Sequence, residues 1–381
     1  MTDVQLTDRE RDHGERAIAL VDGDVHTVML PSSMHARLST RWQGHLTDFG
    51  PRIPGAYAMY PRMRNGGYRI DARPEEGFAG SDIRLVQEQL LDEYDMDHAV
   101  LTPMQPQTFG AESPELAAAL CSALNDWTRE EWLDQDARLL GSICPPHEHP
   151  DLAVAEIERL AGDDRFVQVL LPGTLEQGLG NRRYWPMLRA AAEAGLPVAL
   201  HTGGLAQPKG AGWPAYYLDM HALLGTTMAG QMLSMICSGL FDEIPDLQVV
   251  AVETGIAWAA SLSWTIDDAW RAFGEAEITR LRRPPSEYLR ENWWFTTQPI
   301  EEPDDPEHLA FAFDAIGMVD RILFSSDYPH WDFDSPEQTL PRSISKEDKA
   351  KIFAGNACRL YGLGDAARRS GSASPTTLGR R

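Results

Sequence analysis

IALVDGD, residues 18–24, is a short apolar run that ends in an aspartate, and seven further short apolar runs follow it along the chain. They begin near residues 98, 139, 166, 197, 247, 293 and 321, and amphipathic stretches lie between them. Such alternation indicates a parallel sheet whose strands are joined by helices. Eight of these units predict an α/β fold of the (β/α)8 TIM-barrel type. An open Rossmann-like sheet is the alternative, but no G-x-G-x-x-G follows the first run.

The same pattern divides the chain into an arm, one domain and a tail. Residues 1–17 are polar and charged, and we expect them to form an N-terminal arm. Residues 18–363 are predicted to form a single barrel domain with a long insertion after strand 1, at about 31–80. The insertion has no clear hydrophobic period and is predicted as loop with some helical turns. Residues 364–381 are small, polar and basic, which is typical of a disordered tail.

Composition narrows the class of partner. The formal net charge of −23 argues against nucleic acid and anionic membranes, which need a basic footprint. A small anionic substrate remains compatible, because it needs only a local arginine or a metal ion. The N-terminus does not resemble a signal peptide, no apolar run could span a bilayer, and the four cysteines form no C-x-x-C pair. We therefore expect a cytoplasmic protein, with a homodimer as the commonest default assembly.

Potential metal ligands gather at the ends of a few of the predicted strands. In a TIM barrel the chemistry takes place at the carboxyl ends of the strands. Those ends carry Asp24 and His26 on strand one, His201 on strand five, Glu253 on strand six and Asp327 on strand eight. Each could singly be a helix cap or a structural histidine. Together, two imidazoles and several carboxylates suit one divalent ion, zinc first, with manganese, iron or cobalt as alternatives.

Five segments give the chain a family resemblance: VDGDVH (21–26), ALHTGG (199–204), FDEIPDLQVVAVETG (241–255), LFSSDYPHWD (323–332) and IFAGNACRLYG (352–362). From about residue 20 to residue 363 the chain resembles the amidohydrolase superfamily. Within it, the chain is similar to the amidohydrolase-related group that includes aminocarboxymuconate semialdehyde decarboxylase and the resorcylate-type decarboxylases. The resemblance implies that Asp24, His26, His201 and Asp327 bind the metal.

The chain departs from that family pattern at two positions. The first motif is Asp-x-His rather than His-x-His or Glu-x-His, so Asp24 could bind the metal directly, bind it through water, or orient His26. Strand six ends in Glu253 where the decarboxylases usually have a histidine, so Glu253 could act as a general acid or base or as a partner of another side chain. Strand four carries no lysine, the residue that bridges two metals in binuclear relatives, and one ion is therefore expected.

Further candidates lie in the loops. His221 could assist catalysis or cap a helix, and His330 and Trp331 follow the metal aspartate where they could contact substrate. Arg52, with Arg62 and Arg64 in the insertion, could clamp a substrate carboxylate, although solvent exposure or an interface is the favoured explanation for each of these arginines.

These residues support two hypotheses about the reaction. The first is non-oxidative decarboxylation of an aromatic or unsaturated carboxylic acid, with Asp327 as proton carrier and Glu253 and His221 assisting. The second is hydrolysis of an amide, lactone or ester, with Asp327 as general base. A hydratase and a non-catalytic binding barrel are the remaining alternatives.

Overall fold

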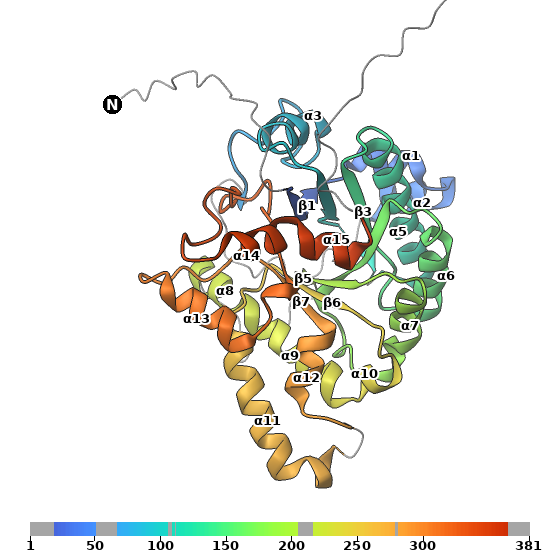
Figure 1. Cartoon of the computed structure of the whole chain (residues 1–381). Coiled ribbons are helices and arrows are strands. Elements are labelled where there is room, and N and C mark those ends of the chain that lie inside the picture. Colours follow the sequence, from blue (N-terminus) through green and yellow to red (C-terminus); the bar gives the residue numbers. More distant parts are fainter. Residues whose placement is uncertain are drawn as a thin grey trace, which may run out of the picture.

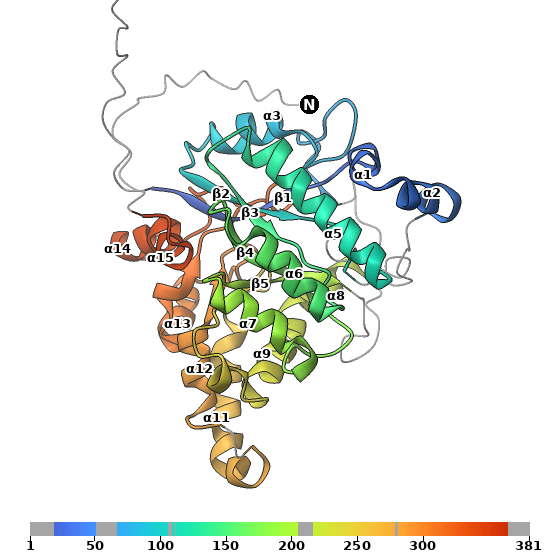
Figure 2. The same cartoon turned by 90° about the vertical axis from the view of Figure 1, so that its right-hand side faces the viewer.

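The structure is a computed structural model that describes residues 19–50, 67–105, 109–110, 112–204, 216–278 and 281–364. Eight parallel strands pair in sequence order, and helices surround them (Figures 1 and 2). The strands are β1 Val21–Thr27, β2 His98–Pro103, β3 Leu139–Ile143, β4 Phe166–Thr174, β5 Val198–Gly204, β6 Val249–Val252, β7 Trp293–Thr296 and β8 Ile322–Leu323. The predicted (β/α)8 barrel is confirmed.

The barrel closes between its first strand and the segment that follows its last one. The amide of Gly23 donates to the Phe324 carbonyl at 2.8 Å, and the amide of His26 donates to the Tyr328 carbonyl at 2.7 Å. Val25 and Tyr328 form a parallel bridge. β8 itself spans two residues, whereas the sequence predicts a strand over 321–327. After β8 the amides of Phe324, Ser325 and Ser326 donate to the Ile352 carbonyl, Thr297 Oγ1 and Asp22 Oδ1 instead of to a neighbouring strand, and φ at residue 327 is +57°.

The longer helices lie outside the barrel, and α11 (Trp258–Glu277) extends away from it (Figures 1 and 2). They are α1 Pro31–Arg37, α2 Thr40–Phe49, α5 Pro114–Thr128, α6 Pro150–Leu160, α7 Trp185–Glu193, α8 Tyr217–Ala222, α9 Leu224–Cys237, α11 Trp258–Glu277, α12 Pro285–Asn292, α13 Glu307–Ile316 and α15 Asn356–Tyr361. Shorter pieces are α3 Ile83–Val86, α10 Leu240–Glu243 and α14 Lys346–Ala350, the π-helical turns Gln87–Leu91, Arg129–Leu133 and Lys351–Gly355, and the 3-10 turns Arg182–Tyr184 and Val319–Arg321. No helix among the described residues is long and apolar enough to cross a membrane.

Two parts of the prediction need correction. α1 and α2 occupy the start of the insertion, where mostly loop was expected, and α12 was not predicted. Both helices are mostly polar: α2 has Trp42, Leu46 and Phe49 as its large apolar residues, and α12 has Tyr288 and Leu289. So few apolar residues give little hydrophobic periodicity in the sequence. The predicted arm 1–17, nearly all of the tail and Arg52, Arg62 and Arg64 lie outside the described residues, so the division into arm, domain and tail stays a prediction.

The connection from β4 to α7 packs tightly against α9. The amide of Leu179 donates to Gln231 Oε1 at 2.9 Å, and Gln231 Nε2 donates to the carbonyl of Gly173 at 2.9 Å. A Cβ atom added at Gly180 would lie 1.9 Å from the backbone oxygen of Ser234. Glycine is therefore required at residue 180 by contact with another backbone, which cannot move aside as a side chain would.

We predict that Gly180→Ala lowers the free energy of unfolding by about 1–3 kcal/mol, because the added methyl group overpacks this contact. Gly230→Ala on α9 is the matched control, since nothing lies within 4 Å of a Cβ built there. The control should raise stability by roughly 0.5–1 kcal/mol, as expected for alanine in a helix. Urea unfolding of both variants measures the difference, and equal stabilities would contradict the proposed contact.

His147, between β3 and α6, is fully buried, and neither of its ring nitrogens has a hydrogen-bond partner among the described residues. Burial and the neighbouring His149 lower the pKa of His147 to about 3, although the backbone of Pro145 acts to raise that pKa. An unfolded histidine takes up a proton near pH 6.5. Between about pH 6.5 and pH 3 the unfolded chain therefore binds one more proton at this residue than the folded chain does.

This difference predicts that stability falls as the pH drops below 6.5. Between pH 7.5 and pH 5, His147 should account for about 2 kcal/mol of the loss. His147→Gln cannot take up this proton, so its loss over the same range should be smaller by that amount. Urea unfolding of the metal-free proteins at both pH values is the measurement, and parallel curves for the two proteins would refute the expectation.

Candidate metal centre

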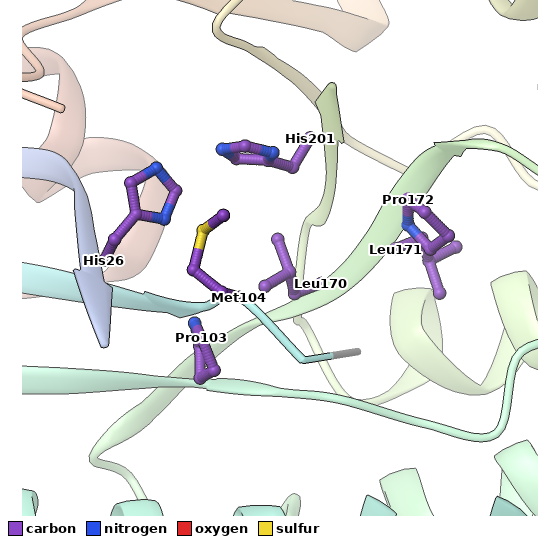
Figure 3. Close-up of a pocket in the computed structure, with 7 residues that line it drawn as sticks. All are labelled: His26, Pro103, Met104, Leu170, Leu171, Pro172 and His201. Carbon is purple, nitrogen blue, oxygen red and sulfur yellow. The ribbon is translucent and has the colours of Figure 1, made fainter. Parts of the chain in front are cut away.

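The carboxyl ends of β1, β5, β6 and β8 bring five of the predicted site residues together. One ligand atom from each of Asp24, His26, His201 and Glu253 lies within 4.8 Å of the others. His26, Asp327 and His330 form a second group by the same measure. Figure 3 shows the His26 and His201 rings beside a small cavity of about 10 Å³, lined below them by Met104 and Leu170. That volume is enough for one water-sized occupant.

Backbone carbonyls fix the direction of both imidazoles. His26 Nδ1 lies 2.9 Å from the Thr102 carbonyl, and His201 Nδ1 lies 2.7 Å from the Thr202 carbonyl. A carbonyl only accepts, so each Nδ1 carries a hydrogen and donates it. Each Nε2 is therefore directed into the cluster. Metal-binding histidines are typically oriented in this way, with one nitrogen on the ion and the other donating to an oxygen.

The inward-facing nitrogens lie among carboxylate oxygens. His26 Nε2 is 2.8 Å from Asp327 Oδ1 and 3.8 Å from Asp24 Oδ2, and His201 Nε2 is 3.6 Å from Asp24 Oδ2. Both Nε2 atoms and Asp24 Oδ2 are buried, and none makes a hydrogen bond of acceptable geometry. Buried polar atoms without such bonds are costly unless something else satisfies them. A divalent cation among these atoms would do so, and the residues present fit one.

Asp24 presents one oxygen to this cluster. Its Oδ1 accepts a hydrogen bond from the Thr102 hydroxyl, which leaves Oδ2 facing both imidazoles. Burial alone would raise the pKa of Asp24. The charges of His26 and His201 and the hydrogen bond from Thr102 outweigh burial and hold the pKa well below its usual range. Of the three roles left open by the sequence, this geometry supports Asp24 as a direct ligand.

The pKa of His201 shifts in the opposite direction from that of Asp24. Burial lowers its pKa, but Asp24 and Glu253 outweigh burial and raise the pKa well above that of a free histidine. The cluster therefore favours a positive charge at Nε2, either a proton or a metal ion. Since both would occupy the same atom, binding of the metal releases the proton.

Asp327 and Glu253 both have backbone conformations that side chains rarely adopt, with φ of +57° and +60°. Asp327 Oδ1 accepts from His330 Nδ1 at 2.7 Å as well as lying next to His26. Glu253 Oε2 lies 3.1 Å from His201 Nε2 and accepts from the Thr202 hydroxyl at 2.8 Å. Left-handed non-glycine residues concentrate at functional sites. The structure places Glu253 beside the metal-facing histidine rather than at a distance from it.

Asp22 connects the two aspartates of the cluster from below. Its Oδ1 accepts from the amide of Asp24 at 3.1 Å and from the amide of Ser326, next to Asp327, at 3.0 Å. Burial raises the pKa of Asp22 to about 7, although its hydrogen bonds to Ser326 and Asp24 oppose the shift. One buried carboxyl thus holds the backbone of β1 against the loop after β8.

Of the remaining predicted residues, the structure describes His330, His221 and Trp331. His330 stacks on Tyr68, with ring centroids 5.1 Å apart, and contacts Asp327. His221 Nε2 pairs with Asp332 Oδ2 at 3.0 Å, and the Trp331 indole donates to the Tyr217 hydroxyl at 2.8 Å. Arg52 lies outside the described residues.

Sequence reasoning missed three contributors. Thr102 and Thr202 orient the histidines through their carbonyls and also bind the carboxylates, yet threonines at strand ends gave no distinguishing signal. Tyr68 lies in the insertion, whose end pairs with the loop after β8: the amide of Arg69 donates to the Pro329 carbonyl at 3.0 Å, and that of Trp331 to the Gly67 carbonyl at 2.9 Å. This pairing joins two segments that are more than 250 residues apart in the sequence.

A protein-family model described as Amidohydrolase matches residues 21–363. The chain belongs to this amidohydrolase family. That confirms the resemblance inferred from the sequence motifs. The chain is also 29% identical over 299 residues to the gamma-resorcylate decarboxylase of Polaromonas sp. strain JS666, a match that covers 74% of this chain and 88% of that protein.

Two solved structures share the barrel of this amidohydrolase. One is a dihydroxybenzoic acid decarboxylase from Polaromonas sp. JS666 with bound manganese and the inhibitor 2-nitroresorcinol; its TM-score is 0.64 at 23% identity, and the match covers 91% of this chain and 97% of that one. The other is a 5-carboxyvanillate decarboxylase from Novosphingobium aromaticivorans with bound manganese; its TM-score is 0.67 at 19% identity, over 92% and 99% of the two chains. At these identities the structures support the fold.

The cluster predicts that the amidohydrolase purifies with, or takes up, about one divalent ion per chain, and that His201→Ala reduces this content to a small fraction. Loss of the imidazole removes one of the two nitrogen ligands. His308→Ala is the control, because His308 lies on α13 and is 75% exposed. Elemental analysis after dialysis measures the content. An unchanged metal content in His201→Ala would contradict this assignment of the site.

Proposed function

We propose that this amidohydrolase catalyses the metal-dependent, non-oxidative decarboxylation of a hydroxylated aromatic acid. The observation that carries the proposal is the buried cluster in which two inward-facing Nε2 atoms lie among the carboxylates of Asp24, Glu253 and Asp327. The family membership and the 29% identity to a gamma-resorcylate decarboxylase over most of both chains support the same reaction.

The reaction replaces a carboxyl group by hydrogen. A proton is added to the ring carbon that bears the carboxylate, the bond from that carbon to the carboxyl carbon breaks, its electron pair returns to the ring, and CO₂ leaves. A divalent ion held by Asp24, His26, His201 and Asp327 would supply a Lewis acid that binds the carboxylate and an adjacent oxygen of the substrate. The chain must supply the proton.

Asp327 is the proposed proton carrier. Its Oδ1 lies between His26 Nε2 and His330 Nδ1, at 2.8 and 2.7 Å. Burial lowers the pKa of His330, but the charge of Asp327 outweighs burial and raises that pKa to about 9. A protonated His330 would keep Asp327 oriented and would return a proton to it after transfer.

Glu253 and His221 have different proposed roles. Glu253 contacts His201 and Thr202, so it fixes the histidine and adds negative charge near the ion. His221 pairs with Asp332 outside this group, and that hydrogen bond, against the effect of burial, raises its pKa. The pair could therefore donate a hydrogen bond to a substrate hydroxyl or carry a proton.

We propose a single divalent ion. Two imidazoles and carboxylate oxygens suit zinc, and they also suit manganese, which the two similar solved structures contain. Metal analysis of protein expressed without added metal would distinguish the two.

Hydrolysis is the second candidate, and Glu253 is the observation that favours it. Its carboxylate is 15% exposed beside His201, where it could remove a proton from water. Hydrolysis incorporates solvent oxygen into the product, whereas decarboxylation incorporates none. A reaction in H₂¹⁸O therefore separates the two activities.

We predict that the metal-loaded protein releases CO₂ from 2,6-dihydroxybenzoate or a related hydroxybenzoate. In D₂O the product should carry deuterium at the carbon that lost the carboxyl group. Asp327→Asn should lower kcat by at least about 10²-fold, because the amide cannot carry the proton. Asp305→Asn, at a site 58% exposed, should leave kcat unchanged. No CO₂ release across a panel of such acids would contradict the proposal, and the metal content of each variant shows whether its site is intact.

A further inference from the structure

A cavity of about 520 Å³ is lined in part by Thr254 and Gly255, the two residues that follow Glu253 of the cluster. Its other walls come from α8 and α9, from the start of α11, and from the segment after β7. Leu224 and Ala229 line it from α9, Trp258 and Leu262 from α11, Ile300 from the segment after β7, and His221 from α8. None of these is among the proposed metal ligands.

The polar groups of these walls are largely engaged with one another. The Trp258 indole donates to the Thr254 carbonyl at 2.9 Å, so the ring, and not a free N–H group, faces the cavity. Both oxygens of Glu301 lie 3.0 Å from the amide of Ile256, and Oε1 also accepts from Ala257 at 2.9 Å. The carboxylate is therefore used at the start of α11, where negative charge is stabilised. What remains for a ligand is mainly aromatic and aliphatic surface.

His221 connects this cavity to the metal cluster. It lines the cavity and is bonded to Asp332, and the charges of Glu253 and Asp327 both act on it. Its ring centroid lies 6.3 Å from that of Trp331, which follows His330 directly in the chain. A ligand whose carboxylate is at the metal could therefore extend past His221 into the cavity.

The space beside the two histidines and the cavity between α9 and α11 differ greatly in volume. The space lined by His26 and His201 is about 10 Å³ and cannot contain an aromatic ring. The 520 Å³ cavity falls in the range of small-molecule binding sites, and it exceeds the needs of one ring with hydroxyl groups.

We propose that the cavity between α9 and α11 receives the part of the substrate that lies farthest from its carboxylate, and that it selects aromatic acids that carry an apolar substituent larger than a hydroxyl group at that end. This inference rests on the proposed function for the position of the carboxylate. The cavity itself is defined independently of the reaction, so its test measures binding and not turnover.

The test compares two compounds that cannot lose CO₂, 2-nitroresorcinol and 5-hexyl-2-nitroresorcinol, by calorimetric titration of the metal-loaded protein. The hexyl group points away from the nitro group, which replaces the carboxylate. If it enters the apolar cavity, the hexyl compound should bind at least about tenfold more tightly than the parent.

Ala229→Phe should remove at least about tenfold of the affinity for the hexyl compound and change that for the parent less than about twofold, because the new ring occupies the cavity. Gly230→Phe is the matched control: the same side chain is placed on the next residue, which does not line the cavity and has open space around its Cβ. Leu262→Trp adds bulk to the opposite wall of the cavity. This variant takes the place of Ala229→Phe in the test if Ala229→Phe does not fold.

Equal affinities of the wild type for the two compounds would overturn the proposal, as would an equal loss of both in Ala229→Phe or no binding of either. A selective loss in Ala229→Phe supports it even if no hydroxybenzoate is decarboxylated, in which case the proposed reaction fails and the binding site stands.

Discussion

The site depends on an electrostatic constraint: several carboxylates are buried at one end of the barrel, and something positive must lie among them. Asp24 and Asp327 are almost fully buried, and Glu253 is only slightly exposed. Buried charges are stable only when paired or coordinated to a metal. Two imidazoles are held with one nitrogen facing this group, because the other nitrogen donates a hydrogen bond to the Thr102 or Thr202 carbonyl. The barrel thus provides a preformed position for a cation.

Barrel closure and site assembly use the same residues. The strand pair that closes the barrel is β1 with the segment after β8, and these two stretches carry Asp24, His26 and Asp327. Asp22 accepts a hydrogen bond from an amide of each stretch. The positions of the proposed ligands therefore depend on the same contacts that hold the barrel closed. Glu253, just after β6, and Asp327, in the segment after β8, both have positive φ, and their carboxylates lie next to the histidines. Backbone strain of this kind persists only where the surroundings enforce it.

The sequence predicted the architecture and the membership of the cluster better than its internal geometry. Eight apolar runs and polar residues at their ends were enough to place Asp24, His26, His201, Glu253 and Asp327 on one rim, since the carboxyl ends of parallel strands meet there. The short β8 and helix α12 could not be predicted in the same way. The residues after Leu323 form hydrogen bonds outside the sheet that no local pattern reveals, and α12 has only two large apolar residues. The roles of Thr102, Thr202 and Tyr68 depend on contacts between distant segments, which one sequence does not reveal.

The proposed ligands and most of the α9–α11 cavity wall come from different elements. The proposed ligands lie at the ends of β1 and β5 and in the loop after β8, whereas the cavity is formed by α8, α9, α11, the segment after β7, and Thr254 and Gly255 after β6. Mutations can therefore accumulate in Leu224, Ala229 or Leu262 without disturbing the ion. If the cavity selects the substrate as proposed, substitutions in its walls would let a gene duplicate acquire a new substrate while it keeps the metal ligands and the reaction. The same separation makes the cavity wall a natural starting point for redesign by directed evolution.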